Sequence, residues 1–171
     1  MAEQQPWRYL IALGSNIRHH RHGDPRAVLR AALTALNARD VTLEAASPII
    51  DSAPLGPSRR RFANGAALIS TCLTPPDLLA QLQTIERQFG RRRGQRWGAR
   101  VLDLDIVLWD GGHWRSRKLT LPHPAFRFRP FVLAPALHVA PDWRDPITGL
   151  SLRQLHTRLT RRPPLPRARL R

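Results

Sequence analysis

Two aspartates stand two residues apart inside an apolar segment near the middle of the chain. The segment Arg96–Asp110 reads RWGARVLDLDIVLWD and carries Asp103 and Asp105 among valine, leucine and isoleucine. Side chains alternate along a β-strand, so both carboxylates lie on one face, with Cα atoms about 7 Å apart. Burying an unpaired carboxylate is costly, so each needs a cationic partner. That partner is either an arginine or magnesium, which prefers oxygen ligands and shares them with phosphates.

Arginine is concentrated in the glycine-rich segment just before this strand. The arginines there are Arg91, Arg92, Arg93, Arg96 and Arg100. Two carboxylates cannot neutralise all of these guanidinium groups, so the excess charge is available to bind a polyanion such as phosphate. Carboxylates beside arginines suit phosphoryl transfer, which needs metal ions to bridge phosphates and cations to absorb charge. The Walker sequence G-x-x-x-x-G-K-[ST] is absent, so any nucleotide site is of another type.

The composition narrows the class of protein. Among 171 residues, 28 are basic and 12 acidic, giving a net charge of +16, and all the basic residues except Lys118 are arginine. The single cysteine, Cys72, excludes a disulfide framework and a Cys-based zinc site, and its apolar surroundings predict a buried thiol. Apolar runs fall short of the roughly 20 residues of a membrane span, and the N-terminal segment lacks a signal-peptide core. We therefore expect a cytoplasmic protein with phosphate-bearing partners.

The elements that must position the carboxylates are predicted from hydrophobic spacing and caps. Asp24-Pro25 and Thr74-Pro75 each supply an N-cap followed by proline at the first helical position. The predicted order is strand 8–13, helix 25–37, strand 41–50 with Pro48 at an edge or bulge, strand 62–71, helix 75–89 and strand 101–110. This order predicts an α+β fold, a ferredoxin-like α/β sandwich in which helices pack on the faces of an antiparallel sheet.

Strict alternation makes a further prediction for the strand that carries the two aspartates. The side chains expected under the helices are Leu102, Leu104, Ile106 and Leu108. Downstream, a short strand near Leu119–Leu121 and a helical stretch around Phe131–Leu137 are expected. We interpret residues 1–160 as one domain, and residues 161–171, rich in proline and arginine, as a disordered tail.

Short motifs run along the chain in a fixed order. They are ALGSN (12–16), PLGP (54–57), F-x-N (62–64), IE (85–86), GRRRGQRWGARVLDLDIVLW (90–109), LPHP (121–124), R-x-F-V-L (129–133) and AP (140–141). Together, from about Tyr9 to Leu155, they resemble the 6-hydroxymethyl-7,8-dihydropterin pyrophosphokinases of folate biosynthesis. The resemblance implies the α/β sandwich described above. It also implies transfer of the terminal diphosphate of ATP to the hydroxymethyl group of the pterin, with release of AMP.

The resemblance implies roles for single residues around the phosphates. Asp103 and Asp105 match aspartates that hold two magnesium ions, while Arg91 and Arg100 match arginines that steady the transferring phosphates. The positions that match nucleotide contacts are Gln83, Glu86, Arg93, Arg96, Trp97, Ile106, His123 and Arg129. Glu86 could instead pair with Arg100.

The pterin site implied by the resemblance is aromatic and polar. Phe62 and Phe131 match the rings that sandwich the heterocycle, and Asn64, with the backbone around Ser52 and Leu55, reads its polar edge. An offset-stacked ring adds about 0.5–1.5 kcal/mol beyond area burial, so this arrangement is physically reasonable. The expected partners are these small-molecule substrates, bound by a monomer, without a membrane or a specific nucleic acid.

Two other readings share part of the pattern. An arginine-rich nucleic-acid-binding module would use structural carboxylates, but single-strand platforms need several aromatics on one sheet face, and aromatics are 6% of this chain. A two-metal nuclease would use Asp103 and Asp105 but leaves F-x-N and PLGP unexplained. The histidines at 19, 20 and 22 have the density of a metal site, although a solvated basic turn is the expected reading.

Overall fold

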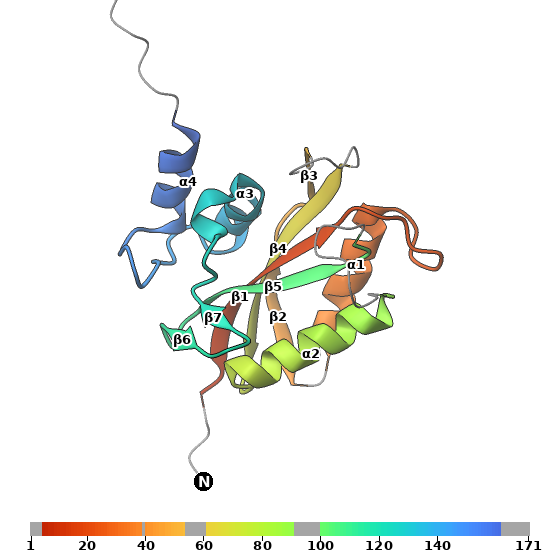
Figure 1. Cartoon of the computed structure of the whole chain (residues 1–171), viewed down its shortest axis with the longest axis horizontal. Coiled ribbons are helices and arrows are strands. Elements are labelled where there is room, and N and C mark those ends of the chain that lie inside the picture. Colours follow the sequence, from red (N-terminus) through yellow and green to blue (C-terminus); the bar gives the residue numbers. More distant parts are fainter. Residues whose placement is uncertain (1–4, 39, 54–60, 91–99, 162–171) are drawn as a thin grey trace, which may run out of the picture.

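The computed structural model describes residues 5–38, 40–53, 61–90 and 100–161, which form a twisted sheet with helices on both faces (Figure 1). The elements are β1 (Trp7–Ser15), α1 (Pro25–Leu36), β2 (Val41–Ala46), β3 (Ile50–Ser52), β4 (Phe62–Thr71), α2 (Pro75–Gln88), β5 (Asp103–Trp109), β6 (Trp114–Arg115), β7 (Thr120–Leu121), η1 (Phe126–Phe128), α3 (Pro130–Val139) and α4 (Leu152–Thr160). The predicted helix around Phe131–Leu137 is therefore α3.

The main sheet confirms the predicted α+β sandwich. Its strands follow the order β2-β4-β1-β5, with β3 also paired to β4, and every pairing is antiparallel. This is the strand order that the split β-α-β units of a ferredoxin-like fold produce. The strand predicted over 41–50 is divided into β2 and β3, because the chain leaves the ladder around Ser47 and Pro48.

One face of the sheet is covered by α1 and α2. Tyr9, Ile11 and Leu13 of β1 point into this core by the alternation of a strand, and Leu29 and Leu82 reach it from the helices. The carboxylate of the predicted N-cap Asp24 accepts a hydrogen bond from the Ala27 N–H, at 2.8 Å. The second helix ends at Gln88, and Gly90, just past the C-cap Phe89, has a φ of +84°, which explains the glycine that the sequence places there.

The opposite face is covered by η1, α3 and α4. Leu10 of β1 packs there with Phe126, Leu133 and Leu152. The sequence reading missed α4, although its capping box is visible in the sequence. The Ser151 hydroxyl accepts from the Gln154 N–H, and the Gln154 side chain accepts from the Ser151 N–H.

The alternation predicted for β5 is wrong at one residue. Leu104 and Ile106 lie under the helices, but Leu108 packs with the α3 and α4 core. The pairing of β1 with β5 shifts here: Leu10 faces Leu108 whereas Ile11 faces Ile106, so Val107 forms a bulge. An extra residue in one strand reverses the facing of the side chains that follow it.

Two further expectations need correction. Cys72 is exposed rather than buried, because it follows the last residue of β4. The histidine-rich turn is not fully solvated, since His19 is buried and His22 stacks on Phe89 at a centroid distance of 4.7 Å.

The described residues contain no group of three or more His, Cys, Asp or Glu side chains that could hold a metal ion. Within the same ranges, no helix is long and apolar enough to cross a membrane.

Candidate active site

An open cleft lies where β1 ends and β4 and β5 begin. Its lining residues are Ala12, Leu13, Gly14, Phe62, Asn64, Arg100, Asp103, Asp105, Arg129, Phe131 and Val132. The sheet register explains much of this set, because Gly14 of β1 pairs with Asn64 of β4 on one side and with Asp103 of β5 on the other. Three residues far apart in the sequence thus lie side by side on the floor.

The two aspartates are the first and third residues of β5, and both line the cleft, as expected for side chains on one face of a strand. Asp103 accepts a hydrogen bond from the Arg100 guanidinium at 2.7 Å, and Asp105 pairs in the sheet with Ala12. Burial raises the pKa of Asp105, and the nearby negative charge of Asp103 raises it further. The charge of His123 when it is protonated, and the charges of Arg129 and Arg100, only partly oppose this rise. The site therefore disfavours the simultaneous ionisation of Asp103 and Asp105, and a further bound cation would stabilise both carboxylates in their charged form.

A magnesium ion fits this donor set. Asp103 and Asp105 offer hard oxygen ligands on one face of a strand, and their mutual repulsion is what a divalent cation relieves. Magnesium is commonly held by one or two carboxylates, with phosphates and water completing the octahedron.

His123 lies beside the carboxylates as a neutral group. Its Nδ1 accepts a hydrogen bond from the backbone N–H of Ala125 at 3.1 Å, and the backbone N–H of His123 donates to the Val107 carbonyl at 2.9 Å. Burial lowers the pKa of His123, although the charge of Asp105 acts in the opposite direction. An imidazole whose Nδ1 accepts a bond carries its proton on Nε2, so it can donate to a ligand.

The aromatic end of the cleft is built by β4 and α3. Phe62 is the first residue of β4, and Phe131 lies in the first turn of α3. The Asn64 amide donates to the Ser52 hydroxyl at 2.7 Å, which fixes the side chain at the cleft wall. The Arg129 guanidinium lies 6.0 Å from the centre of the Phe131 ring. Two half-buried rings, an oriented amide and a guanidinium suit a flat, polar heterocycle next to an anion.

Comparison with known proteins agrees with this geometry. The family model of 7,8-dihydro-6-hydroxymethylpterin-pyrophosphokinase (HPPK) matches residues 10–141, which contain every cleft residue named above. The chain belongs to this family. A 2-amino-4-hydroxy-6-hydroxymethyldihydropteridine pyrophosphokinase of Pseudomonas aeruginosa is 45% identical over 141 residues, covering 81% of this chain and 84% of the relative. Its counterpart from Synechocystis is 37% identical over 152 residues, covering 89% and 76%.

Solved structures support the HPPK fold. A Plasmodium falciparum HPPK-DHPS structure aligns with a TM-score of 0.70 at 12% identity, covering 92% of this chain and 45% of that one. A second HPPK-DHPS structure, in complex with substrates, aligns with a TM-score of 0.72 at 10% identity, covering 90% and 45%. At such identities the likeness shows the fold alone. This chain spans less than half the length of those two proteins.

Several residues that the HPPK resemblance singled out lie away from the cleft. Gln83 is exposed on α2, and the Ile106 side chain belongs to the core between the sheet and the helices. Glu86 is 2% exposed and accepts a hydrogen bond from the Leu104 N–H at 2.8 Å, so it ties α2 to the strand that carries the aspartates. The residues that lie outside the described ranges are Leu55, Arg91, Arg93, Arg96 and Trp97.

Asn16, to which the sequence analysis assigned no role beyond the ALGSN motif, holds the cleft residue Arg100. It is 6% exposed, its Oδ1 accepts from the Arg100 N–H at 2.7 Å, and its own N–H donates to the Arg100 carbonyl at 3.1 Å. This reciprocal pair holds the backbone of Arg100 against the end of β1. The ALGSN motif marked Asn16 as a residue of interest, but the sequence could not identify Arg100 as its partner, because the two residues are 84 positions apart.

Proposed function

We propose that this cleft is where the protein, as a pyrophosphokinase of folate biosynthesis, transfers diphosphate from ATP to the hydroxymethyl group of 6-hydroxymethyl-7,8-dihydropterin. The products are AMP and the pterin diphosphate. One observation carries the proposal: a pair of carboxylates with an arginine, and a pair of phenylalanines with an oriented amide, line the same cleft. The first group suits a metal-bound polyphosphate and the second suits a pterin.

The phosphate end is proposed to act through charge and position. Asp103 and Asp105 are assigned to hold two magnesium ions, which when bound offset the charge of the triphosphate. Arg100, already oriented by Asp103 and Asn16, is assigned to hold the diphosphate that is transferred, together with Arg91. Arg129 and His123 both interact electrostatically with Asp105, and both are assigned to the nucleotide.

At the pterin end, the rings of Phe62 and Phe131 are assigned to stack on the two faces of the heterocycle. Asn64, held by Ser52, is assigned to its polar edge. A pterin placed between these rings would share one cleft with Asp103 and Asp105, and we assign its hydroxymethyl group to their side. Holding both reactants in one orientation removes much of the entropic part of the barrier.

The bond that forms joins the hydroxyl oxygen of the pterin to the β-phosphorus of ATP. The bond that breaks joins that phosphorus to the bridging oxygen of the α-phosphate, which leaves on AMP. Positioning and charge neutralisation dominate phosphoryl transfer, so a strong general base is not required. We assign the activity to one domain, residues 1–160, because the described cleft residues all lie between positions 12 and 132. We further propose that this domain works as a monomer.

The products test the proposal directly. The protein is incubated with magnesium, ATP and 6-hydroxymethyl-7,8-dihydropterin, and the nucleotides are separated by ion-exchange chromatography. AMP should appear in a one-to-one ratio with pterin diphosphate, and should depend on the pterin. ADP as the main product would refute attack at the β-phosphorus.

A further inference from the structure

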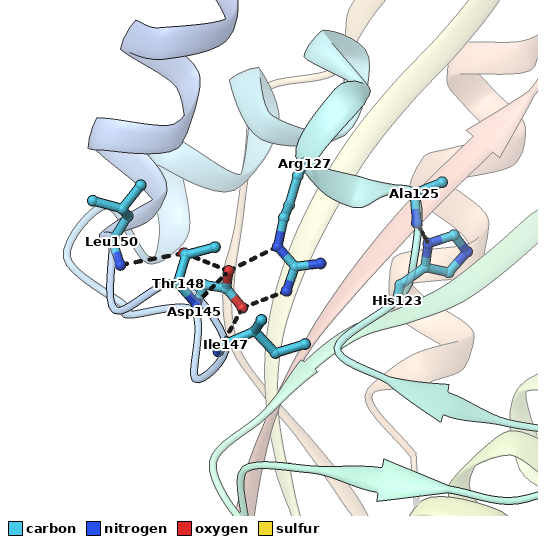
Figure 2. A network of polar contacts seen from close by, with 7 residues as sticks. All are labelled: His123, Ala125, Arg127, Asp145, Ile147, Thr148 and Leu150. Carbon is cyan, nitrogen blue, oxygen red and sulfur yellow. Dashed lines mark hydrogen bonds and ion pairs between the residues drawn. The ribbon is translucent and has the colours of Figure 1, made fainter.

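A buried ion pair lies outside the cleft, in the layer formed by η1, α3 and α4 (Figure 2). The Asp145 side chain is 0% exposed, and its two oxygens accept from the Nε and Nη2 atoms of Arg127 at 2.7 and 2.6 Å. Asp145 also accepts from the Thr148 hydroxyl at 2.6 Å and from the N–H groups of Ile147 and Thr148 at 3.2 and 3.3 Å. The carboxylate is therefore held by its own turn and in turn holds Arg127 in a bidentate fork.

The two partners join a segment that lies outside the cleft to a segment that carries cleft residues. Asp145 lies in the turn that leads to α4, which contributes no residue to the cleft. Arg127 is the middle residue of η1, directly between His123 and the cleft residues Arg129 and Phe131. The ion pair thus connects a part of the molecule without a role in ligand binding to the segment that carries several of the assigned contacts.

Backbone hydrogen bonds between residues three or four positions apart connect the segment from His123 to Phe131. The N–H of Phe126 donates to the His123 carbonyl at 3.2 Å, and that of Arg129 donates to the Phe126 carbonyl at 3.2 Å. The Leu133 N–H then donates to the Arg129 carbonyl at 3.0 Å, which starts α3. A shift of Arg127 would therefore carry Arg129 and the first turn of α3 with it.

Apolar packing alone holds η1 weakly. Of its two phenylalanines, Phe126 is 1% exposed whereas Phe128 is 76% exposed. A single buried ring anchors this one-turn helix at one point of the core, whereas a bidentate ion pair fixes direction as well as distance. Buried ion pairs add little net stability compared with apolar residues of similar size, so fixing a direction is the better physical account of this one.

We propose that Arg127 and Asp145 are positioning residues that set Arg129 and Phe131 in the cleft for ligand binding. The inference rests on the proposed function, because Phe131 must contact the pterin for its position to matter. It predicts that loss of the Arg127 fork weakens pterin binding through Phe131, without any contact between Arg127 and the ligand.

A double-mutant cycle tests this coupling. Dissociation constants of 6-hydroxymethyl-7,8-dihydropterin, with magnesium and a non-hydrolysable ATP analogue present, are measured for the unaltered protein, Arg127→Met, Phe131→Ala and the double variant. Arg127→Met should raise the constant about tenfold, within the hundredfold that a misplacement of about 1 Å can cost. In the Phe131→Ala background the same change should cost about twofold or less, because the ring it positions is gone.

Two matched variants separate positioning from general loosening. Leu155→Ala shortens a buried side chain of α4 in the same core, so it lowers stability without touching the ion pair, and it should leave the pterin constant within about twofold. Arg127→Lys keeps the charge without the fork and should restore only part of the binding. Because Arg127→Met leaves Asp145 bonded to Thr148 and Ile147, it is expected to fold.

The outcomes are distinct. Non-additive losses in the cycle, with Leu155→Ala close to the unaltered protein, support the inference. Equal losses from Arg127→Met in both backgrounds, or an equal loss from Leu155→Ala at matched stability, would overturn it while AMP formation by the unaltered protein still stands. Failure of the unaltered protein to form AMP would instead refute the proposed function, and this inference with it.

Discussion

The two faces of the sheet are covered in different ways. On one face, α1 and α2 close over a continuous apolar layer in which Tyr9, Ile11 and Leu13 are almost fully buried. On the other face, α3 and α4 cover Leu10 and Leu108, but beyond them the same surface opens into the cleft with Asp105 and Arg129. Neighbouring residues of β1 and β5 therefore serve either the core or the cleft, depending on which way they point.

This difference shows how one sheet can carry both stability and chemistry. The closed face has the close packing that makes a domain stable. The open face carries charges and half-buried rings whose burial would be costly without a ligand. Changes to the open face should therefore alter binding and turnover while leaving the fold intact, and changes to the closed face should do the reverse.

The largest effect is expected from the carboxylates of the open face. Asp103→Asn and Asp105→Asn should each lower kcat at least about a hundredfold, because each removes a negative ligand from the metal site. Steady-state rates at millimolar magnesium, with circular dichroism spectra as a control for the fold, measure this. A variant with a rate near that of the unaltered protein would contradict the metal assignment.

The closed face should give the opposite result. Leu82→Ala removes a side chain of α2 that is 1% exposed, and it should lower the free energy of unfolding by about 2–5 kcal/mol. At a temperature where the variant is still folded, its kcat should stay within about twofold of the unaltered protein. Urea unfolding and rates on the same sample test this, and a large loss of turnover in the folded variant would break the division between the faces.

Within the open face, one substitution should affect the affinities for the two ligands differently. Phe131→Ala should weaken pterin binding by about 1 kcal/mol or more, since the ring is assigned to stack on the heterocycle, and should leave the affinity for ATP nearly unchanged. Calorimetric titration with each ligand measures both constants. Equal losses for the two ligands would identify Phe131 as a core residue of the α3 layer rather than a contact.

A smaller effect is expected on how the free energy of unfolding depends on pH in acid. Burial alone would raise the pKa of Asp145, but hydrogen bonds from Arg127, Thr148 and Ile147 bring it below its ordinary value of 3.8. A lowered pKa in the folded state contributes stability that is present above that value and is lost as the pH falls through the folded pKa. The free energy of unfolding of Asp145→Asn should therefore lie well below that of the unaltered protein at pH 7, and the gap should narrow below about pH 4. A gap independent of pH would show that the negative charge does not matter.

Local patterns in the sequence accounted for much of this molecule. The N-caps Asp24 and Thr74, each followed by a proline, and the strand Phe62–Thr71 appear where they were predicted. Asp103 and Asp105 share a face because two residues span one period of a strand, which no tertiary contact is needed to establish. The ordered motifs predicted the family, and Phe62, Asn64 and Phe131 then fell into one cleft.

Tertiary structure decided the features that join distant segments. The bulge at Val107 turns the Leu108 side chain to the other face of the sheet, because the pairing register of β1 and β5 shifts there. A bulge is defined by the pairing of two strands, so the sequence of β5 alone does not reveal it. Asn16 meets Arg100, and Arg127 meets Asp145, only because the fold brings them together. Spacing along a chain fixes which side chains share a face of one element. Which elements then face one another depends on packing between residues far apart in the sequence, and here that packing determines what Asn16, Glu86 and Arg127 hold in place.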